Sequence, residues 1–207
     1  MAISFPNDDL MAEGRYRSQT FRPLRRDELS RQQNGVIRGR VLGTPLWFAR
    51  FTTVRMDRYT ARSFEALLNS VDGVTNPIYV YDWRAKFPAA YPNSGFTDSG
   101  EIGSLPSTTS LTLKSLPADF EITRGDMFHF NDGSQRSLHQ AVESVTANGS
   151  GVTAEFEVRP ALPGFAAVDK AVTFKRPSCR MVIVPDSVEI ETEDDFTTIT
   201  YSAIQTY

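Results

Sequence analysis

The stretch from Ile122 to Val145 holds both histidines of the chain, His129 and His139, together with the tripeptide Arg124-Gly125-Asp126. Two histidines across a hairpin can ligate zinc, but a zinc site needs three or four ligands, and no third one has a recognisable spacing. The tripeptide matches a cell-adhesion loop, although a match of this length often arises by chance. We therefore expect an ordinary β-hairpin here, with Asn131-Asp132-Gly133 as its tight turn.

The other reactive residues form no catalytic pattern. The acidic run from Asp186 to Asp195 could bind a divalent cation, but it lacks the ligand spacing and the central glycine of a calcium loop. Cys179 has no motif that pairs it with a base, so it is expected to be a small buried apolar residue. Asn148-Gly149-Ser150 matches a glycosylation acceptor and is interpreted as a turn. Without a nucleophile elbow or a phosphate-binding loop, the sequence predicts no enzyme, no cofactor and no metal site.

Composition and charge favour a folded chain that associates. The 207 residues are 40% apolar and 23% charged, which argues against disorder, and no run is long enough to span a bilayer or to act as a secretion signal. Residues 1–90 hold 14 Lys/Arg against 9 Asp/Glu, whereas residues 91–207 hold 8 against 16. Opposite charge on two parts of one chain can steer copies together head to tail. The alternative is two solvated surfaces of different sign.

The first ninety residues predict a hairpin, a helix and a strand. The hairpin is expected to join Val36–Gly43 to Leu46–Met56 through Thr44-Pro45, with the second strand covered on both faces. Apolar residues three and four apart predict a helix over Arg58–Val71. Asp57 or Thr60 is expected to cap its start and Gly73 to follow its end. A compact strand is expected at Ile78–Asp82.

A second unit is expected to interrupt the first. Residues 83–106 are rich in Pro, Gly, Ser and Tyr, which marks a boundary, and five short strands with turn signals follow. Such strands predict a small antiparallel barrel. Two more strands after Pro177 are expected to return to the first unit. The predicted domains are therefore residues 1–90 plus 178–207, and an inserted barrel at residues 91–177.

A basic stretch precedes all of these elements. Its arginines are interleaved with Tyr16 and Phe21, and they are Arg15, Arg17, Arg22, Arg25, Arg26 and Arg31. Basic residues mixed with aromatics can contact nucleic acid, and Arg and aromatics are also enriched at protein interfaces. Both interpretations, a nucleic-acid contact and an arm between subunits, stay open.

The order of these pieces resembles a known family. The basic arm precedes WFARFTTVRMDRYTARSFEALLNSVDGVTNPIYVYD (Trp47–Asp82), and RGDMFHF, AVESVTANGSGVTAEFEVRPAL and KRPSCRMVIV follow. Over most of residues 15–207 the chain resembles the distal tail protein of long-tailed, siphovirus-like bacteriophages, a family related to tail-tube proteins. The resemblance implies a mainly β fold: a tail-tube-like β-sandwich or split barrel with one flanking α-helix, plus a small antiparallel OB-like β-barrel insertion.

The same resemblance implies a function. It implies a structural virion protein at the tail tip, made in the host bacterial cytoplasm, that forms a ring, commonly a hexamer. The ring would join the tail-tube protein to the tip and hub proteins of the baseplate, and it would continue the channel through which DNA passes without specific binding. The acidic residues Asp186, Glu189, Glu191 and Glu193 are candidates for the channel wall or for a contact between rings.

Two other classes of function remain as alternatives. The small barrel is a candidate carbohydrate-binding module for host-surface recognition, for which an open aromatic face would be needed. The aromatic residues available are Tyr91, Phe96, Phe128 and Phe165. An enzyme on a split barrel, such as a flavin reductase, is the third class.

Overall fold

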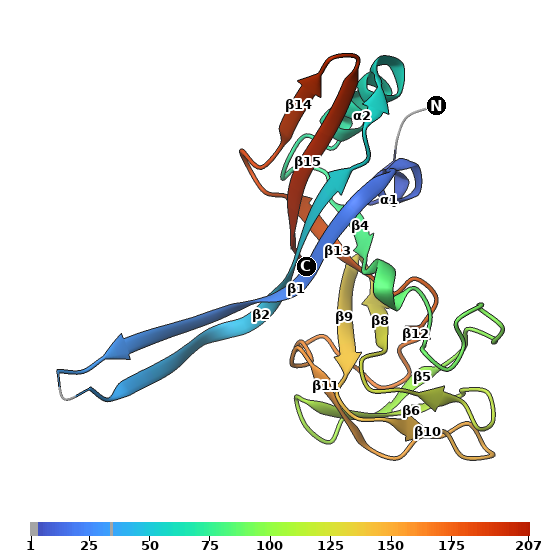
Figure 1. Ribbon diagram of the computed structural model, residues 1–207. Coiled ribbons are helices and arrows are strands. Elements are labelled where there is room, and N and C mark those ends of the chain that lie inside the picture. The colour runs from blue at the N-terminus through green and yellow to red at the C-terminus, as the bar shows by residue number, and fades with distance from the viewer. Residues whose placement is uncertain (1–3, 34) are drawn as a thin grey trace.

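The computed structural model describes residues 4–33 and 35–207, and these residues are mainly β. Seven strands form one antiparallel sheet with the order β1-β2-β15-β13-β4, and β14 and β3 pair with β15 beside this path. The strands of this sheet are β1 (Tyr16–Arg31), β2 (Ile37–Thr53), β3 (Met56–Asp57), β4 (Ile78–Tyr81), β13 (Ser178–Ile183), β14 (Glu189–Glu193) and β15 (Phe196–Gln205). Figure 1 shows them in blue, green and red, because they come from both ends of the chain.

The longest element is the hairpin of β1 and β2, and it corrects a prediction. The hairpin expected within residues 36–56 is wrong, because both predicted strands belong to β2, and the partner of β2 is the basic stretch, which forms β1. The ladder shifts register between Leu24 and Asp27, close to Pro23 and Pro45. A bulge beside an edge strand tolerates a residue without an N–H group, so Pro45 does not end β2.

The predicted helix is confirmed. Helix α2 spans Arg58–Ser70, and the Asp57 carboxylate accepts hydrogen bonds from the backbone N–H groups of Tyr59 and Thr60. Gly73 follows with φ +63°, a left-handed conformation that costs glycine little. The short helix α1 (Asp9–Glu13) lies beside α2 and was not predicted.

Helix α2 packs on one face of the sheet. There Phe64 of the helix meets an aromatic cluster, in which Tyr16 lies 5.0 Å from Phe51 and Phe51 lies 5.1 Å from Tyr201 between ring centroids. The opposite face carries the alternate residues Phe48, Arg50 and Thr52 of β2, and none of these is buried. The expected cover on both faces of β2 is therefore wrong, because this second face of β2 is only half-buried or exposed.

The second unit is a nearly closed, barrel-like sheet with the order β12-β8-β9-β11-β6-β5. Its strands are β5 (Glu101–Ser104), β6 (Ser110–Lys114), β8 (Met127–Asp132), β9 (Gln135–Ala141), β11 (Phe156–Arg159) and β12 (Val172–Thr173), and β7 (Glu121–Ile122) pairs with β10 (Val145–Thr146) outside it. The barrel has a separate apolar core that includes Phe120, Phe128 and Phe156. After it the chain re-enters the first sheet through β13, as Figure 1 shows.

The segment that enters the barrel is fixed by Asp126. After the 3-10 turn η1 (Trp83–Ala85), the N–H group of Ala89 donates to the Asp126 carboxylate at 2.8 Å, and so does that of Thr123. Asp126 is 5% exposed. The tripeptide that resembles an adhesion motif is thus a structural tie, because its carboxylate is buried and both of its oxygens accept hydrogen bonds.

Replacing this carboxylate is expected to destabilise the chain. Asp126→Ala removes the charged acceptor of two part-buried hydrogen bonds, which costs about 2 kcal/mol of the free energy of unfolding. Urea unfolding measures the loss. The matched control is Arg124→Ala in the same tripeptide, because Arg124 is exposed and should change stability by less than about 0.5 kcal/mol. Equal stability of Asp126→Ala and the wild type would contradict this role.

Candidate assembly surfaces

The two histidines do not form a site. His129 pairs with Leu138 across the β8–β9 ladder, so His129 and His139 lie on opposite faces of this sheet and cannot share a metal ion. In the described ranges, no three His, Cys, Asp or Glu residues gather as metal ligands.

Both histidines are structural instead. His129 Nδ1 accepts a hydrogen bond from the N–H group of Ser178, and His139 Nδ1 donates to the carbonyl of Pro160 while its Nε2 accepts from the Ser137 hydroxyl. Burial lowers the pKa of His129 to about 3 and that of His139 to about 4. Both rings are therefore neutral at pH 7.

Cys179 is buried, as expected for a small apolar residue. Burial raises the pKa of its thiol far above the ordinary value, and its sulfur lies 3.8 Å from the carbonyl oxygen of Val80. A thiol that stays protonated is a poor nucleophile, so Cys179 fills space in the core.

The acidic run forms strand β14 and the turn into β15. Glu189, Glu191 and Glu193 alternate along β14 and share one face, on which they are exposed. Arg50 pairs with Glu189 at 3.4 Å, and Arg55 pairs with Glu193 at 3.6 Å. Exposed pairs of this kind contribute little to stability, so the row serves as a charged surface.

These glutamates lie on the face of the sheet opposite α2. The register places Glu189 beside Thr200, Thr200 beside Thr52, and Thr52 beside Ser18, so one polar row crosses β14, β15, β2 and β1. Thr20 and Arg50 form the neighbouring row. The face opposite α2 therefore carries hydroxyl groups and charges of both signs, together with the rings of Phe48 and Phe196.

Within the seven-stranded sheet, the four neighbouring strands β14, β15, β2 and β1 end in two open edges. Within residues 4–33 and 35–207, β14 pairs only with β15, and β1 pairs only with β2. Open edges present unpaired N–H and C=O groups, to which another strand can add. The β14 edge carries only acidic charge, whereas β1 carries a cluster of arginines.

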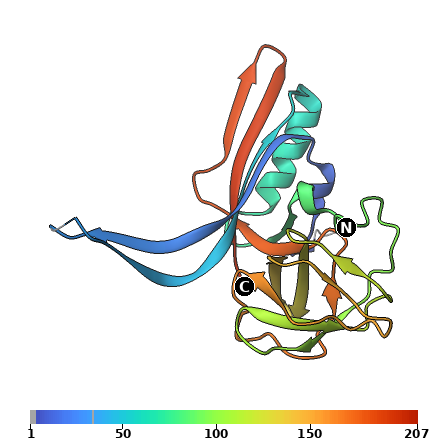
Figure 2. The same cartoon turned by 60° about the horizontal axis from the view of Figure 1, so that its bottom comes forward.

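Beyond the body of the protein, the outer half of the β1–β2 hairpin forms an arm, residues 24–33 and 35–46. Figures 1 and 2 both show it projecting away from the sheet and from the barrel. Direct partners in the ladder share a face, so Leu29, Ile37 and Val41 lie on one face and Arg38 and Arg40 on the other. The three apolar side chains are 73%, 58% and 72% exposed. The face with these three side chains, which also carries Asp27 and Arg31, is called the apolar face, and no residue within 4–33 and 35–207 covers it.

The predictions missed this face, although the sequence carries a signal for it. Ile37-Arg38-Gly39-Arg40-Val41 alternates apolar and basic residues, which is typical of a half-buried strand. The prediction places these residues in one strand of a hairpin and says nothing of what covers its faces. Only the projection of the hairpin makes the stripe a surface.

The apolar face of the arm continues into a groove. This hollow of about 500 Å³ lies where the arm leaves the body beside the barrel. Its lining includes Pro23, Val41 and Pro45 of the hairpin and Pro160 of the barrel, with Arg25 among the charged groups. An apolar groove with a basic rim favours contact with a protein segment rather than catalysis.

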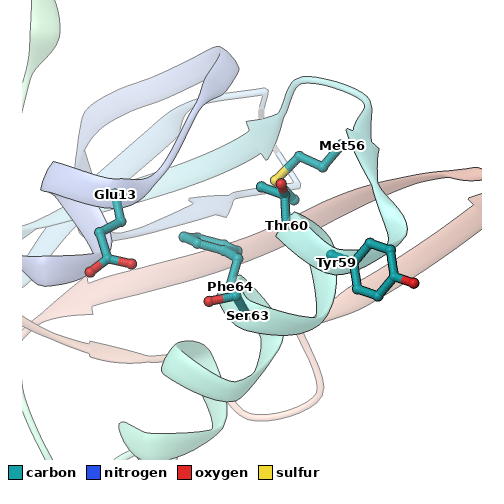
Figure 3. Close-up of a pocket in the computed structure, with 6 residues that line it drawn as sticks. All are labelled: Glu13, Met56, Tyr59, Thr60, Ser63 and Phe64. Carbon is teal, nitrogen blue, oxygen red and sulfur yellow. The ribbon is translucent and has the colours of Figure 1, made fainter.

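A second hollow, of about 340 Å³, lies between α1 and α2 (Figure 3). Glu13 faces the first turns of α2 across it, where Met56 and Phe64 form the apolar floor and Thr60 and Ser63 supply hydroxyls. Among the residues that the structure describes, Glu13 is the only carboxylate in the lining, and no histidine or cysteine contributes to it. This set cannot form an acid–base pair or a nucleophile with its base.

The four candidate aromatics of the barrel do not form an open platform. Phe128 is fully buried, and Tyr91 stacks on Phe120 at 4.9 Å between ring centroids. Phe96 and Phe165 pack against the barrel core and are only partly exposed. Stacking on a sugar needs an exposed ring face, so these residues do not support the carbohydrate-binding alternative.

No described helix has the length and apolarity that a membrane crossing would require. Comparison of the sequence with models of protein families gives no match, and a search of curated proteins finds none with significant similarity.

Proposed function

We propose that this chain is a structural protein of a phage tail, a subunit of a ring at the distal end of the tail tube, and that it is not an enzyme. The observation that carries the proposal is the projecting arm, with its uncovered apolar face beside the groove. An isolated two-stranded hairpin is marginally stable in water, so such an arm gains stability from a partner.

The sheet supports a ring in particular. With α2 on one face and hydroxyl, acidic and basic side chains on the other, the four strands suit the wall of a largely polar channel. Addition of the β14 edge of one copy to the β1 edge of the next would continue the sheet and remove both open edges. We infer that Glu189, Glu191 and Glu193 face the channel, where their charge would repel passing DNA.

The uneven distribution of charge indicates which surfaces of two copies would meet. Residues 22–43 hold six arginines against two acidic residues, whereas residues 184–207 hold six acidic residues and no Lys or Arg. Two different surfaces in contact form a heterologous interface, and a heterologous interface that closes gives a ring. In this proposal the small barrel, an OB-like insertion, lies outside the channel and contacts the tip proteins.

The mass of the chain in solution tests the proposal. At about 0.4 mM protein and low salt, where electrostatic contacts are strongest, we expect a closed oligomer by light scattering and rings with a central hole in negative-stain images. Electron cryomicroscopy of the rings would locate β14, which is expected on the inner wall. A chain that remains a monomer under these conditions would contradict self-assembly into rings, and rings with β14 outside would refute the assignment of the wall.

A further inference from the structure

A third hollow, of about 330 Å³, lies at the junction of the first sheet and the barrel. Tyr79 and Tyr81 of β4 line it, together with Arg136 of β9. Lys175 and Arg176, from the segment that leaves the barrel, complete the basic lining. Ligand sites occur preferentially at such interfaces between two units.

The Arg136 guanidinium is held in place at this junction. It stacks on the Tyr79 ring at 3.6 Å from the centroid. Its Nη1 donates to the Ser178 hydroxyl at 2.6 Å, and its Nε donates to the Asn131 side chain at 2.8 Å. These contacts fix the charge without neutralising it.

The backbone that carries Lys175 and Arg176 is also fixed by hydrogen bonds. The Asp98 carboxylate accepts hydrogen bonds from the N–H groups of Phe174 and Lys175, and the N–H group of Arg176 donates to the carbonyl of Lys86. The Lys175 ammonium lies 5.0 Å from the centroid of the Phe96 ring. The two side chains therefore start from an ordered segment.

The charge of the hollow is not balanced by the chain. In the described part of the chain, none of Arg136, Lys175 and Arg176 forms an ion pair within 4.0 Å. The lining contains one carboxylate, that of Asp8, and a neutral His129. Three cations thus meet one anion in a concave site, which favours an anionic ligand.

We propose that this hollow binds a phosphate group, either as the free ion or as the end of a phosphate monoester. The Nε group of Arg136 already donates to Asn131, so the edge formed by Nε and Nη2 cannot give two parallel hydrogen bonds to a carboxylate. Single donors from three side chains suit the several oxygens of a tetrahedral phosphate. The bound group would connect the barrel, through Arg136, to the segment at Lys175 and Arg176, and it would hold the two units in one orientation.

The proposal is tested by thermal unfolding at pH 7.5 with inorganic phosphate, with glycerol 3-phosphate, and with sodium chloride at the same ionic strength. Relative to chloride, we expect inorganic phosphate at 20 mM to raise the unfolding midpoint by about 3 °C, since a ligand of the folded state stabilises it. Titration calorimetry of the same protein is expected to show a single site. An equal rise with glycerol 3-phosphate would identify an open site for monoesters, and a rise with the inorganic ion alone would identify a site for the free ion.

The double variant Lys175→Ala/Arg176→Ala is expected to abolish this rise while leaving the midpoint in chloride within about 2 °C of the wild type, because both side chains lie outside the cores. The matched control Arg62→Ala/Arg124→Ala removes the same charge at exposed positions and should keep the rise. The single variant Arg176→Gln, which should lose most of the rise, serves if the double variant is unstable. The proposal is overturned if phosphate has no effect beyond chloride, or if the control loses the rise as well. Both readouts are measured on the single chain, so they do not depend on ring formation.

Discussion

Leu29→Glu is expected to abolish the self-assembly of this chain without unfolding it. Leu29 is 73% exposed in the single chain, so a charge there should shift the unfolding midpoint by no more than about 2 °C. In a ring the same carboxylate would be buried on the apolar face of the arm. Burial of an unpaired charge costs at least about 3 kcal/mol, which weakens each contact roughly 100-fold. Sedimentation velocity across a concentration series measures the change.

Ser30→Glu is the matched control for this prediction. Ser30 is the next residue of β1, it is exposed, and its pairing with Arg38 places it on the opposite face of the arm. The control adds the same charge and is expected to retain assembly. If the two variants assemble equally well, the apolar face is not the contact surface. If both become monomers, the contact involves the arm without distinguishing its faces, which would also contradict the prediction.

The second large effect is a loss of stability in mild acid. The folded pKa values of His129 and His139, about 3 and about 4, lie below the ordinary value of 6.5. Below pH 6.5 both histidines become protonated in the unfolded chain, whereas in the folded chain they stay neutral until the pH approaches 4. The contribution of the two neutral imidazoles to the free energy of unfolding is therefore fully present above pH 6.5. It is lost progressively as the pH falls toward 4. Between pH 7.5 and 5.0 we expect a loss of about 2 kcal/mol for each histidine, or about 4 kcal/mol in total.

Urea unfolding at several pH values measures this loss, and His129→Asn provides the comparison. The asparagine oxygen can accept the hydrogen bond that the Ser178 N–H group now donates to Nδ1, but the side chain does not titrate. The variant should show about half of the wild-type pH dependence. Desolvation raises the pKa of Asp126, so this residue makes the folded state more stable as the pH falls. This opposite effect is the same in the wild type and in the variant. Identical slopes for the two proteins would rule out His129 as a cause.

Local signals predicted the local elements well. The spacing of Ala61, Phe64 and Leu68, with Asp57 before them, gave α2 almost to the residue. Strands β4, β13 and β15 lie where β-branched and aromatic residues are concentrated. The five strands expected in the barrel occur near the predicted positions, but one predicted strand, residues 138–147, covers parts of both β9 and β10, and β5 and β7 were missed. Capping, periodicity and turn chemistry act over a few residues, so one sequence suffices to recognise them.

The partner of each strand was harder to predict. The basic stretch before residue 32 contains Pro23 and many charges, and it still forms β1, because β2 supplies a partner along its whole length. No strand was predicted in the acidic run, and it forms β14 because β15 is beside it. The ladder between strands depends on residues far apart in the chain, and propensity carries no information about it.

A mainly β chain with one amphipathic helix, an uneven distribution of charge and no pattern of catalytic residues can be predicted from the residues alone. Which apolar residues are uncovered depends on the folded arrangement of the strands. Ile37 and Phe51 both alternate with polar neighbours in β2, yet Phe51 is buried under α2 and Ile37 is 58% exposed on the arm. An alternation of apolar and polar residues indicates only that a strand has two different faces. Whether a face meets the core, a partner or water depends on what the rest of the chain places against it.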